Sequence, residues 1–158
     1  MQPNAIVAVL DTIQDYFNRS TRVLTEEHSS FAPKPEMFTV AAQVAHAAQT
    51  IDWFFDGVFG GSGFSLDFAK HDAEVRACTS LAAAREWFNA AIARAKAATL
   101  AHGAEEWAQL LPPGPIMGGE PRFFVIGAIN DHTAHHRGAL TVYSRLLGLV
   151  PPMPYGDM

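Results

Sequence analysis

The sequence predicts an all-α protein, a four-helix bundle with short additional helical segments. Apolar residues recur at helical spacing in four long segments. No stretch alternates apolar and polar residues as a half-buried strand would, and no repeat of fixed period is present. Amphipathic helices bury their apolar faces by packing against one another, so we expect an up-and-down type of bundle that can include one longer crossover.

The first two predicted helices cover residues 4–24 and 35–59. The first places apolar residues at helical spacing with acidic and polar residues between them, which is typical of an amphipathic helix. A connection that contains Pro33 separates the two segments, because proline interrupts a helix, and the glycine-rich run 60–63 ends the second. The main apolar stripe of the second helix comprises Met37, Val40, Val44, Ala48, Ile51, Phe55 and Val58.

Residues 66–77 are mixed in character and predict a short or irregular helix. A third long helix follows, with Ser80 as its N-cap, and it extends to about residue 100 before Gly103. Its alanine-rich surface permits close packing against a neighbouring helix.

The last part of the chain contains a brief helical turn at 104–111 and a loop at 112–119 that is too rich in proline and glycine for regular structure. Pro121 then starts the fourth long helix, which ends near Gly148. Three further prolines make the remaining C-terminal residues an extended tail.

Composition excludes several classes of function. The chain has 158 residues, 49% of them hydrophobic and 17% charged, which is typical of one globular domain, and we assign residues 1–158 to it. The longest wholly apolar run, 123–129, is much shorter than the roughly 20 residues of a membrane span. The formal charge of −5 without a Lys/Arg cluster argues against nucleic-acid binding. The N-terminus does not resemble a signal peptide, so we expect a cytoplasmic protein.

Cys78 is the only cysteine, which excludes an internal disulfide and a thiolate zinc site. Any metal ion must therefore use nitrogen and oxygen ligands. We interpret Cys78 as a structural residue rather than a catalytic nucleophile, because buried structural cysteines are commoner.

A histidine pair marks the fourth long helix. His132 and His136 are four residues apart, so they differ by only about 40° around the helix and lie on one face, within its apolar stripe. A buried polar group without a partner costs on the order of 1–3 kcal/mol, and a shared metal ion would give both rings a partner. Hydrogen-bonded core histidines are the alternative. His135 lies about 60° to one side and is less well placed.

With His46 in the second helix and the closing segment LLGLVPPMPYG, this motif resembles the DinB/YfiT-like superfamily of metalloenzymes over essentially the whole chain. The resemblance implies a four-helix bundle whose divalent ion is held by His46, His132 and His136. Ala139 stands where many members carry glutamine, which removes one polar contact near the site. His46 lies about 160° from the main apolar stripe of its helix, so its selection depends on the resemblance.

Three histidine ligands leave a coordination position for water or substrate. We expect zinc, with nickel or iron as alternatives that imidazole also accepts. The resemblance implies a metal-dependent transferase that activates a low-molecular-weight thiol for attack on an electrophile. The expected partners are a small-molecule thiol or electrophilic substrate, with no nucleic acid and no membrane. Superfamily members often form homodimers through bundle helices, so a homodimer is a further expectation.

Two alternative functions stay open. One is a metal-dependent hydrolase, which needs an acid or base near the ion. The carboxylates of suitable type are Asp52, Glu105, Glu106 and Asp131. The other is a non-catalytic stress or binding protein in which a structural ion ties two helices together.

The sequence also predicts the surroundings of several other side chains. Trp53 and Tyr143 project toward the inferred site face and would line a pocket. Arg137 is expected to be a structural partner for a carboxylate or a helix end. The histidines that we expect in solvent are His28, His71 and His102.

Overall fold

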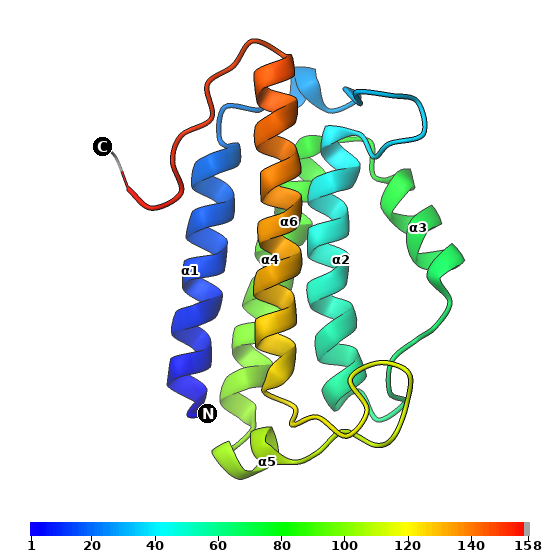
Figure 1. Ribbon diagram of the computed structural model, residues 1–158, viewed down its shortest axis with the longest axis vertical. Helices are drawn as coiled ribbons and strands as arrows, with labels where there is room; N and C mark the ends of the chain where they lie inside the picture. Colours follow the sequence, from blue (N-terminus) through cyan, green and yellow to red (C-terminus); the bar gives the residue numbers. More distant parts are fainter. Residues whose placement is uncertain (157–158) are drawn as a thin grey trace.

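The computed structural model of the protein describes residues 1–156 and is all-helical, which confirms the predicted fold class (Figure 1). The last two residues of the predicted domain, 157 and 158, lie outside the described part. The elements are α1 (Pro3–Thr21), the 3-10 helix η1 (Glu26–His28), α2 (Val40–Phe59), α3 (Phe68–Ala77), α4 (Leu81–Ala101), α5 (Ala104–Ala108) and α6 (Phe124–Leu146).

The four long helices form a bundle with one crossover. In Figure 1, α1 and α6 run upward while α2 and α4 run downward. The connection that contains α3 returns the chain to the upper end of the bundle, so α4 can lie parallel to α2. α2 packs most extensively against α4 and also contacts α6 and α3. α2 is therefore covered on several sides.

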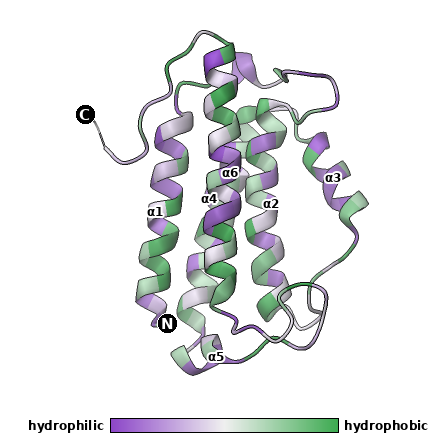
Figure 2. Cartoon of the chain, in the orientation of Figure 1, coloured by the Kyte–Doolittle hydropathy of each residue, from purple (hydrophilic) through white to green (hydrophobic). Residues whose placement is uncertain are grey.

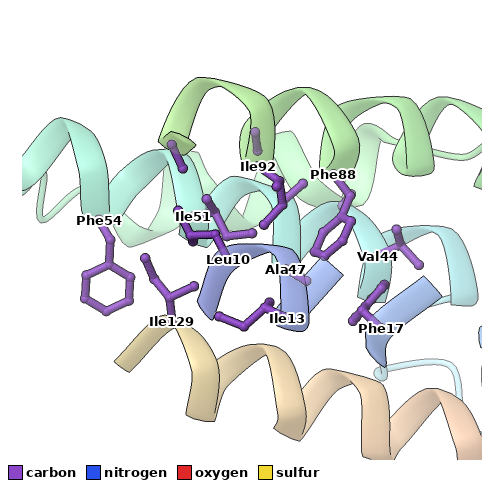
Figure 3. Packing of buried hydrophobic residues seen from close by; sticks show 14 of the residues in the cluster. Leu10, Ile13, Phe17, Val44, Ala47, Ile51, Phe54, Phe88, Ile92 and Ile129 are labelled. Atoms are coloured by element: carbon purple, nitrogen blue, oxygen red, sulfur yellow. The ribbon is translucent and has the colours of Figure 1, made fainter. Parts of the chain in front are cut away.

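Apolar side chains from all four long helices meet in the centre of the bundle (Figure 3). Burying a Val, Leu, Ile or Phe side chain stabilises the fold by roughly 1.5–3 kcal/mol relative to leaving it exposed. Buried alanines on both α2 and α4 let these helices approach closely, as the sequence predicts for α4. The residues labelled in Figure 3 are Leu10, Ile13, Phe17, Val44, Ala47, Ile51, Phe54, Phe88, Ile92 and Ile129.

The first helix ends earlier than predicted, at Thr21 rather than at residue 24. Arg85 of α4 explains this boundary, because its guanidinium donates at 2.7 Å to the carbonyl oxygen of Thr21 and also to that of Leu24. The last carbonyl groups of a helix lack partners within the helix. A side chain from another helix supplies these partners here.

The second helix begins later than predicted, at Val40 rather than at residue 35. The Thr39 hydroxyl accepts a hydrogen bond from the backbone N–H of Ala42 at 3.2 Å and caps the helix. Met37 therefore precedes the helix, and the prediction that it belongs to the apolar stripe is wrong; its side chain is 38% exposed.

α6 begins at Phe124, three residues after Pro121, and ends close to the predicted glycine. Gly148 has a φ of 77°, a left-handed conformation that glycine adopts without strain at the end of a helix. Among the described residues, no helix has both the length and the apolar character to cross a membrane.

Hydropathy is unevenly distributed over the helices (Figure 2). α3 buries only Val75, and it meets α2 through a hydrogen bond between His71 and Gln49 and a ring contact between Phe68 and Trp53. α6 carries a hydrophilic band near its middle, although it lies against two other long helices. This band contains the histidine pair.

Candidate metal centre

Three histidines from two helices meet inside the bundle: His46 of α2 with His132 and His136 of α6. One potential ligand atom of each lies within 4.8 Å of the other two, and no other such group of three occurs within residues 1–156. The Nε2 atoms of His132 and His136 are 3.2 Å apart. Nitrogens bound about 2.0–2.1 Å from a tetrahedral ion would lie roughly 3.3 Å apart. This pair therefore has the spacing of two ligands on one ion.

His46 reaches the cluster because α2 has a second buried face. The sequence indicates one main apolar stripe, and His46 lies opposite it. In the structure α6 packs against that opposite face, where small and polar residues such as Ala42, Gln43 and Thr50 are buried around His46. The His46 ring centroid is 4.9 Å from that of His132 and 4.8 Å from that of His136.

A chain of hydrogen bonds orients His136. Its Nδ1 lies 2.5 Å from the Gln43 side-chain oxygen, and the Gln43 amide donates to the Tyr143 hydroxyl at 3.2 Å. The Tyr143 hydroxyl donates in turn to the carbonyl oxygen of Phe38 at 3.1 Å. Because a carbonyl oxygen can only accept, the direction of the whole chain is determined, and Nδ1 of His136 carries the proton. Its Nε2 therefore presents a lone pair toward His132.

The other two imidazoles are incompletely paired. Nδ1 of His46 and Nδ1 of His132 are both buried without a hydrogen-bond partner. Nε2 of His132 has only the 3.5 Å approach of the Thr50 hydroxyl besides His136. Each unpartnered polar atom costs on the order of 1–3 kcal/mol. The Nε2 atoms of His132 and His136 face each other with little other support from the protein, so the cluster fits a site for a divalent ion.

Burial keeps the cluster uncharged at neutral pH. Burial, with smaller contributions from the neighbouring imidazoles, lowers the pKa of His132 to about 4 and that of His136 to about 3. Burial also lowers the pKa of His46, although the Asp72 carboxylate acts in the opposite direction. Neutral imidazole is the form that binds a metal ion, so all three rings are prepared for ligation.

The histidines adjoin a cavity of about 620 Å³ between α2, α3 and α6. His46 and His132 line it, and so does Trp53, as its place on the site face indicates. Tyr143 does not line the cavity; it supports His136 through Gln43 instead. Asp72 also lines it, a residue that the analysis of segment 66–77 did not single out, because that segment lacks a clear helical period.

The carboxylates considered for a hydrolase are placed differently from one another. Asp131 lines the cavity. Asp52 is held by Arg94 at 2.7 Å and by the Trp87 indole at 2.9 Å. Glu106 accepts from the backbone N–H of Gly103 and pairs with His102, while Glu105 is exposed on the same short helix, α5. Of these four residues, only Asp131 adjoins the cavity of the histidine cluster.

The expectation that the remaining histidines lie free in solvent is wrong. His71 lines the same cavity, with its Nδ1 3.0 Å from the Gln49 amide and its Nε2 3.1 Å from the Ser65 hydroxyl. His102 pairs with a carboxylate of α5, and His28 is 3.0 Å from the Thr25 hydroxyl in η1. One signal in the sequence does indicate that His71 lies on a helix: Asp67 caps the start of α3 by accepting a hydrogen bond from the backbone N–H of Lys70. The packing of α3 against α2 depends on the tertiary structure.

Two flanking residues of the motif also have defined places. His135 is exposed and packs the edge of its ring on His136, outside the group of three. Arg137 lies over the ring of Tyr16, 5.7 Å from its centroid. It thus meets an aromatic face rather than the expected carboxylate or helix end.

The sequence profile of the DinB superfamily matches residues 10–140, a span that extends from α1 into α6 and includes all three histidines. No curated protein matches the chain. The superfamily match covers most of the chain and agrees with the helical bundle and the histidine cluster. The chain belongs to the DinB superfamily.

Proposed function

We propose that this protein is a metal-dependent transferase that activates a low-molecular-weight thiol for attack on an electrophile. One observation carries the proposal: three neutral imidazoles converge beside a cavity of about 620 Å³. Cavities of roughly 300–1,000 Å³ are the usual size of small-molecule sites. Metal binding is typical of the superfamily. Zinc is the ion that we expect, with nickel or iron as alternatives.

His46, His132 and His136 would hold the ion. A divalent ion with three neutral ligands keeps its full charge and, when bound, lowers the pKa of a thiol beside it. Gln43 keeps the His136 ring in the ligating orientation and tautomer. Structural zinc sites usually have four protein ligands, so a set of three leaves a position for a small molecule.

The thiol must come from a cosubstrate, because the protein's own cysteine is unsuited to the role. Cys78 is absent from the residues that line the cavity, and its Sγ donates to the carbonyl oxygen of Ser80 at 3.7 Å. Burial raises the pKa of Cys78, which keeps it a thiol at neutral pH. In the proposed reaction the cosubstrate loses its S–H proton to solvent. A C–S bond then forms as the bond to the leaving group breaks, and that group takes the electron pair.

The proposal is tested by metal content and activity measured together. We expect about one equivalent of metal in protein purified without added metal, its loss in His132→Ala and His136→Ala, and its retention in His102→Ala, a matched histidine outside the cluster. Cobalt-substituted protein should develop a near-ultraviolet thiolate-to-metal absorption band with 2-mercaptoethanol. The same samples should transfer this thiol to 1-chloro-2,4-dinitrobenzene, releasing chloride, only when metal is present.

Other outcomes would contradict the proposal in distinct ways. A metal-free protein that cannot be reconstituted would exclude a metalloenzyme. Metal-dependent hydrolysis without any thiol requirement, lost in Asp131→Asn, would favour the hydrolase. A metal that raises thermal stability but gives neither the thiolate band nor turnover would favour a structural ion.

A further inference from the structure

We infer that the cavity beside the histidines takes a substrate with an aromatic body that is neutral or positively charged, and disfavours one that carries a carboxylate or a phosphate. The inference rests on the proposed function, since it assigns a substrate class to the same cavity. It is carried by two features of the cavity lining, its aromatic wall and its charge.

The aromatic wall consists of ordered rings. The Trp53 ring centroid is 5.0 Å from that of Phe54 and 6.2 Å from that of Phe68. The indole N–H of Trp53 donates to the carbonyl oxygen of Ser65 at 2.9 Å, which holds the ring in one orientation. A ring held in place loses little conformational freedom when a flat ligand packs on it.

Phe68 is the least protected part of this wall. It lies at the start of α3, lines the cavity and is 56% exposed. The protein core therefore leaves much of the Phe68 ring exposed, although burying apolar surface is favourable. An aromatic ligand in the cavity would cover the Phe68 ring and gain the attraction of paired rings.

The described charged side chains that line the cavity are acidic. Asp72 and Asp131 line the cavity, whereas none of its described lining residues is Lys or Arg. Arg76 contacts two of the lining residues, Asp72 and Phe38. Its Nε is 2.8 Å from the Asp72 carboxylate, and its guanidinium lies 4.5 Å from the centroid of the Phe38 ring.

Asp131 is the carboxylate that decides the preference. It is exposed, and Arg76 leaves it unneutralised while pairing with Asp72. Apart from the ion that the histidines would hold, an anionic group in the cavity would find no cationic side chain among the described lining residues, whereas an ammonium group would gain a carboxylate and aromatic faces. The sulfur of a thiol substrate belongs to the histidine side, so the preference concerns the rest of the molecule.

A neighbouring cavity supplies an internal reference. It has a volume of about 720 Å³ and shares Gln49, Trp53 and His71 with the histidine cavity, but it contains none of the three clustered histidines. It is lined by Arg94 and by Trp87, whose indole donates to Asp52. Because Trp53 lines both cavities and Trp87 lines only the neighbouring one, a probe in the histidine cavity should move the indole N–H signal of Trp53 and leave that of Trp87 in place.

The test uses three probes of similar size and different charge: benzyltrimethylammonium, benzyl alcohol and phenylmethanesulfonate. None of them is a strong zinc ligand, so their binding reports the cavity wall rather than an ion. Titrations followed by nitrogen-15 NMR should move the Trp53 indole signal, which Trp53→Phe identifies. We expect the cation and the alcohol to bind at least about fivefold more tightly than the sulfonate, since one unit charge at 4 Å in water is worth about 1 kcal/mol.

Variants identify which residues cause the charge preference and the binding of the aromatic ring. Asp131→Asn should reduce the preference for the cation over the sulfonate by about fivefold. Asp56→Asn, which removes an exposed acid that lines only the neighbouring cavity, should leave it unchanged. Phe68→Ala, a surface change that the fold should tolerate, should weaken the cation and the alcohol alike.

The inference is overturned if the sulfonate binds as tightly as the cation, if the probes move the Trp87 signal as strongly as that of Trp53, or if no probe moves the Trp53 signal. The titrations are repeated after chelation. A charge preference that persists in protein unable to retain any metal would support this inference while contradicting the proposed function. Metal binding and thiol transfer without a charge preference would support the proposed function and contradict this inference.

Discussion

Histidine is buried in two different ways in this bundle. At the base, the His102 ring stacks on Phe59 with centroids 3.9 Å apart and planes 7° apart, and its Nδ1 is 2.9 Å from the Glu106 carboxylate. Arg122 approaches the same Phe59 ring at 5.2 Å. In the middle, His46, His132 and His136 pack against one another, and two of their Nδ1 atoms have no partner.

The difference shows how a structural histidine is distinguished from a candidate ligand. His102 uses both its face and its nitrogen within the protein, so an ion would add nothing to it. In the central cluster the rings stay neutral and the Nε2 lone pair of His136 points toward His132, where a bound ion would give both Nε2 atoms a ligand bond and stabilise the folded state. Both clusters are partly or fully buried, so burial alone does not separate them.

The largest expected effect is the stabilisation of the central cluster by metal. A ligand that binds only the folded state at 1,000 times its Kd stabilises the protein by about 4 kcal/mol. Chelation of zinc-loaded protein should therefore lower the midpoint of thermal unfolding, measured by circular dichroism, by several degrees. The His102→Ala variant should respond in the same way, whereas His136→Ala should not respond to zinc or to chelator. An equal response of His136→Ala would disprove the assigned ligand set.

The next effect is a loss of stability in acid by metal-depleted protein. The pKa values of His132 and His136 lie at about 4 and about 3 when folded, below the 6.5 of an ordinary histidine. Between about pH 6.5 and pH 4 the unfolded chain binds protons that the folded chain does not, so the free energy of unfolding falls as the pH falls. We expect a decrease on the order of 2 kcal/mol, after allowance for solvent screening.

Denaturant titrations at several pH values measure this decrease. Replacing His132 with Phe should flatten the dependence on pH, because it removes one of the groups that must stay neutral. His102→Ala should preserve the dependence. A free energy of unfolding that is constant from pH 7 to pH 4.5 would show that the central rings are accessible to protons in the folded protein.

A smaller effect is expected from the hydrogen-bond chain behind His136. Gln43→Leu removes the acceptor that orients the ring, and loss of such a partner typically weakens metal binding by about 10- to 100-fold. Tyr143→Phe removes only the far end of the chain and should weaken it less. Competition with a chromophoric chelator measures both affinities. An affinity in Gln43→Leu equal to that of the wild type would mean that packing alone orients His136.

The smallest effect is that of His102→Ala on the base of the bundle. Loss of its stacked partner should reduce the free energy of unfolding by about 1 kcal/mol, the value typical of an aromatic pair. Metal affinity should stay within twofold of the wild type. Urea titration of the variant measures the first quantity, and a large loss of metal in the same variant would show that the two clusters are coupled.

The sequence by itself determined whatever depends on neighbours along the chain. Helical spacing predicts the four long helices, and the four-residue separation of His132 and His136 places both rings on one face. Helix ends were less well determined. Side chains from elsewhere shape them, as Arg85 does at the end of α1.

Only the tertiary structure decided how the second half of the site is assembled. The helical pattern of the sequence does not reveal that α6 covers the face of α2 opposite its apolar stripe. The choice of His46 as a ligand therefore depends on the family resemblance rather than on the pattern of apolar residues in its helix. The orienting contact of Gln43 and the placement of His71 on the cavity both join residues far apart in the chain. Such contacts depend on how helices pack, because a helical period specifies which residues share a face but not which helix that face meets.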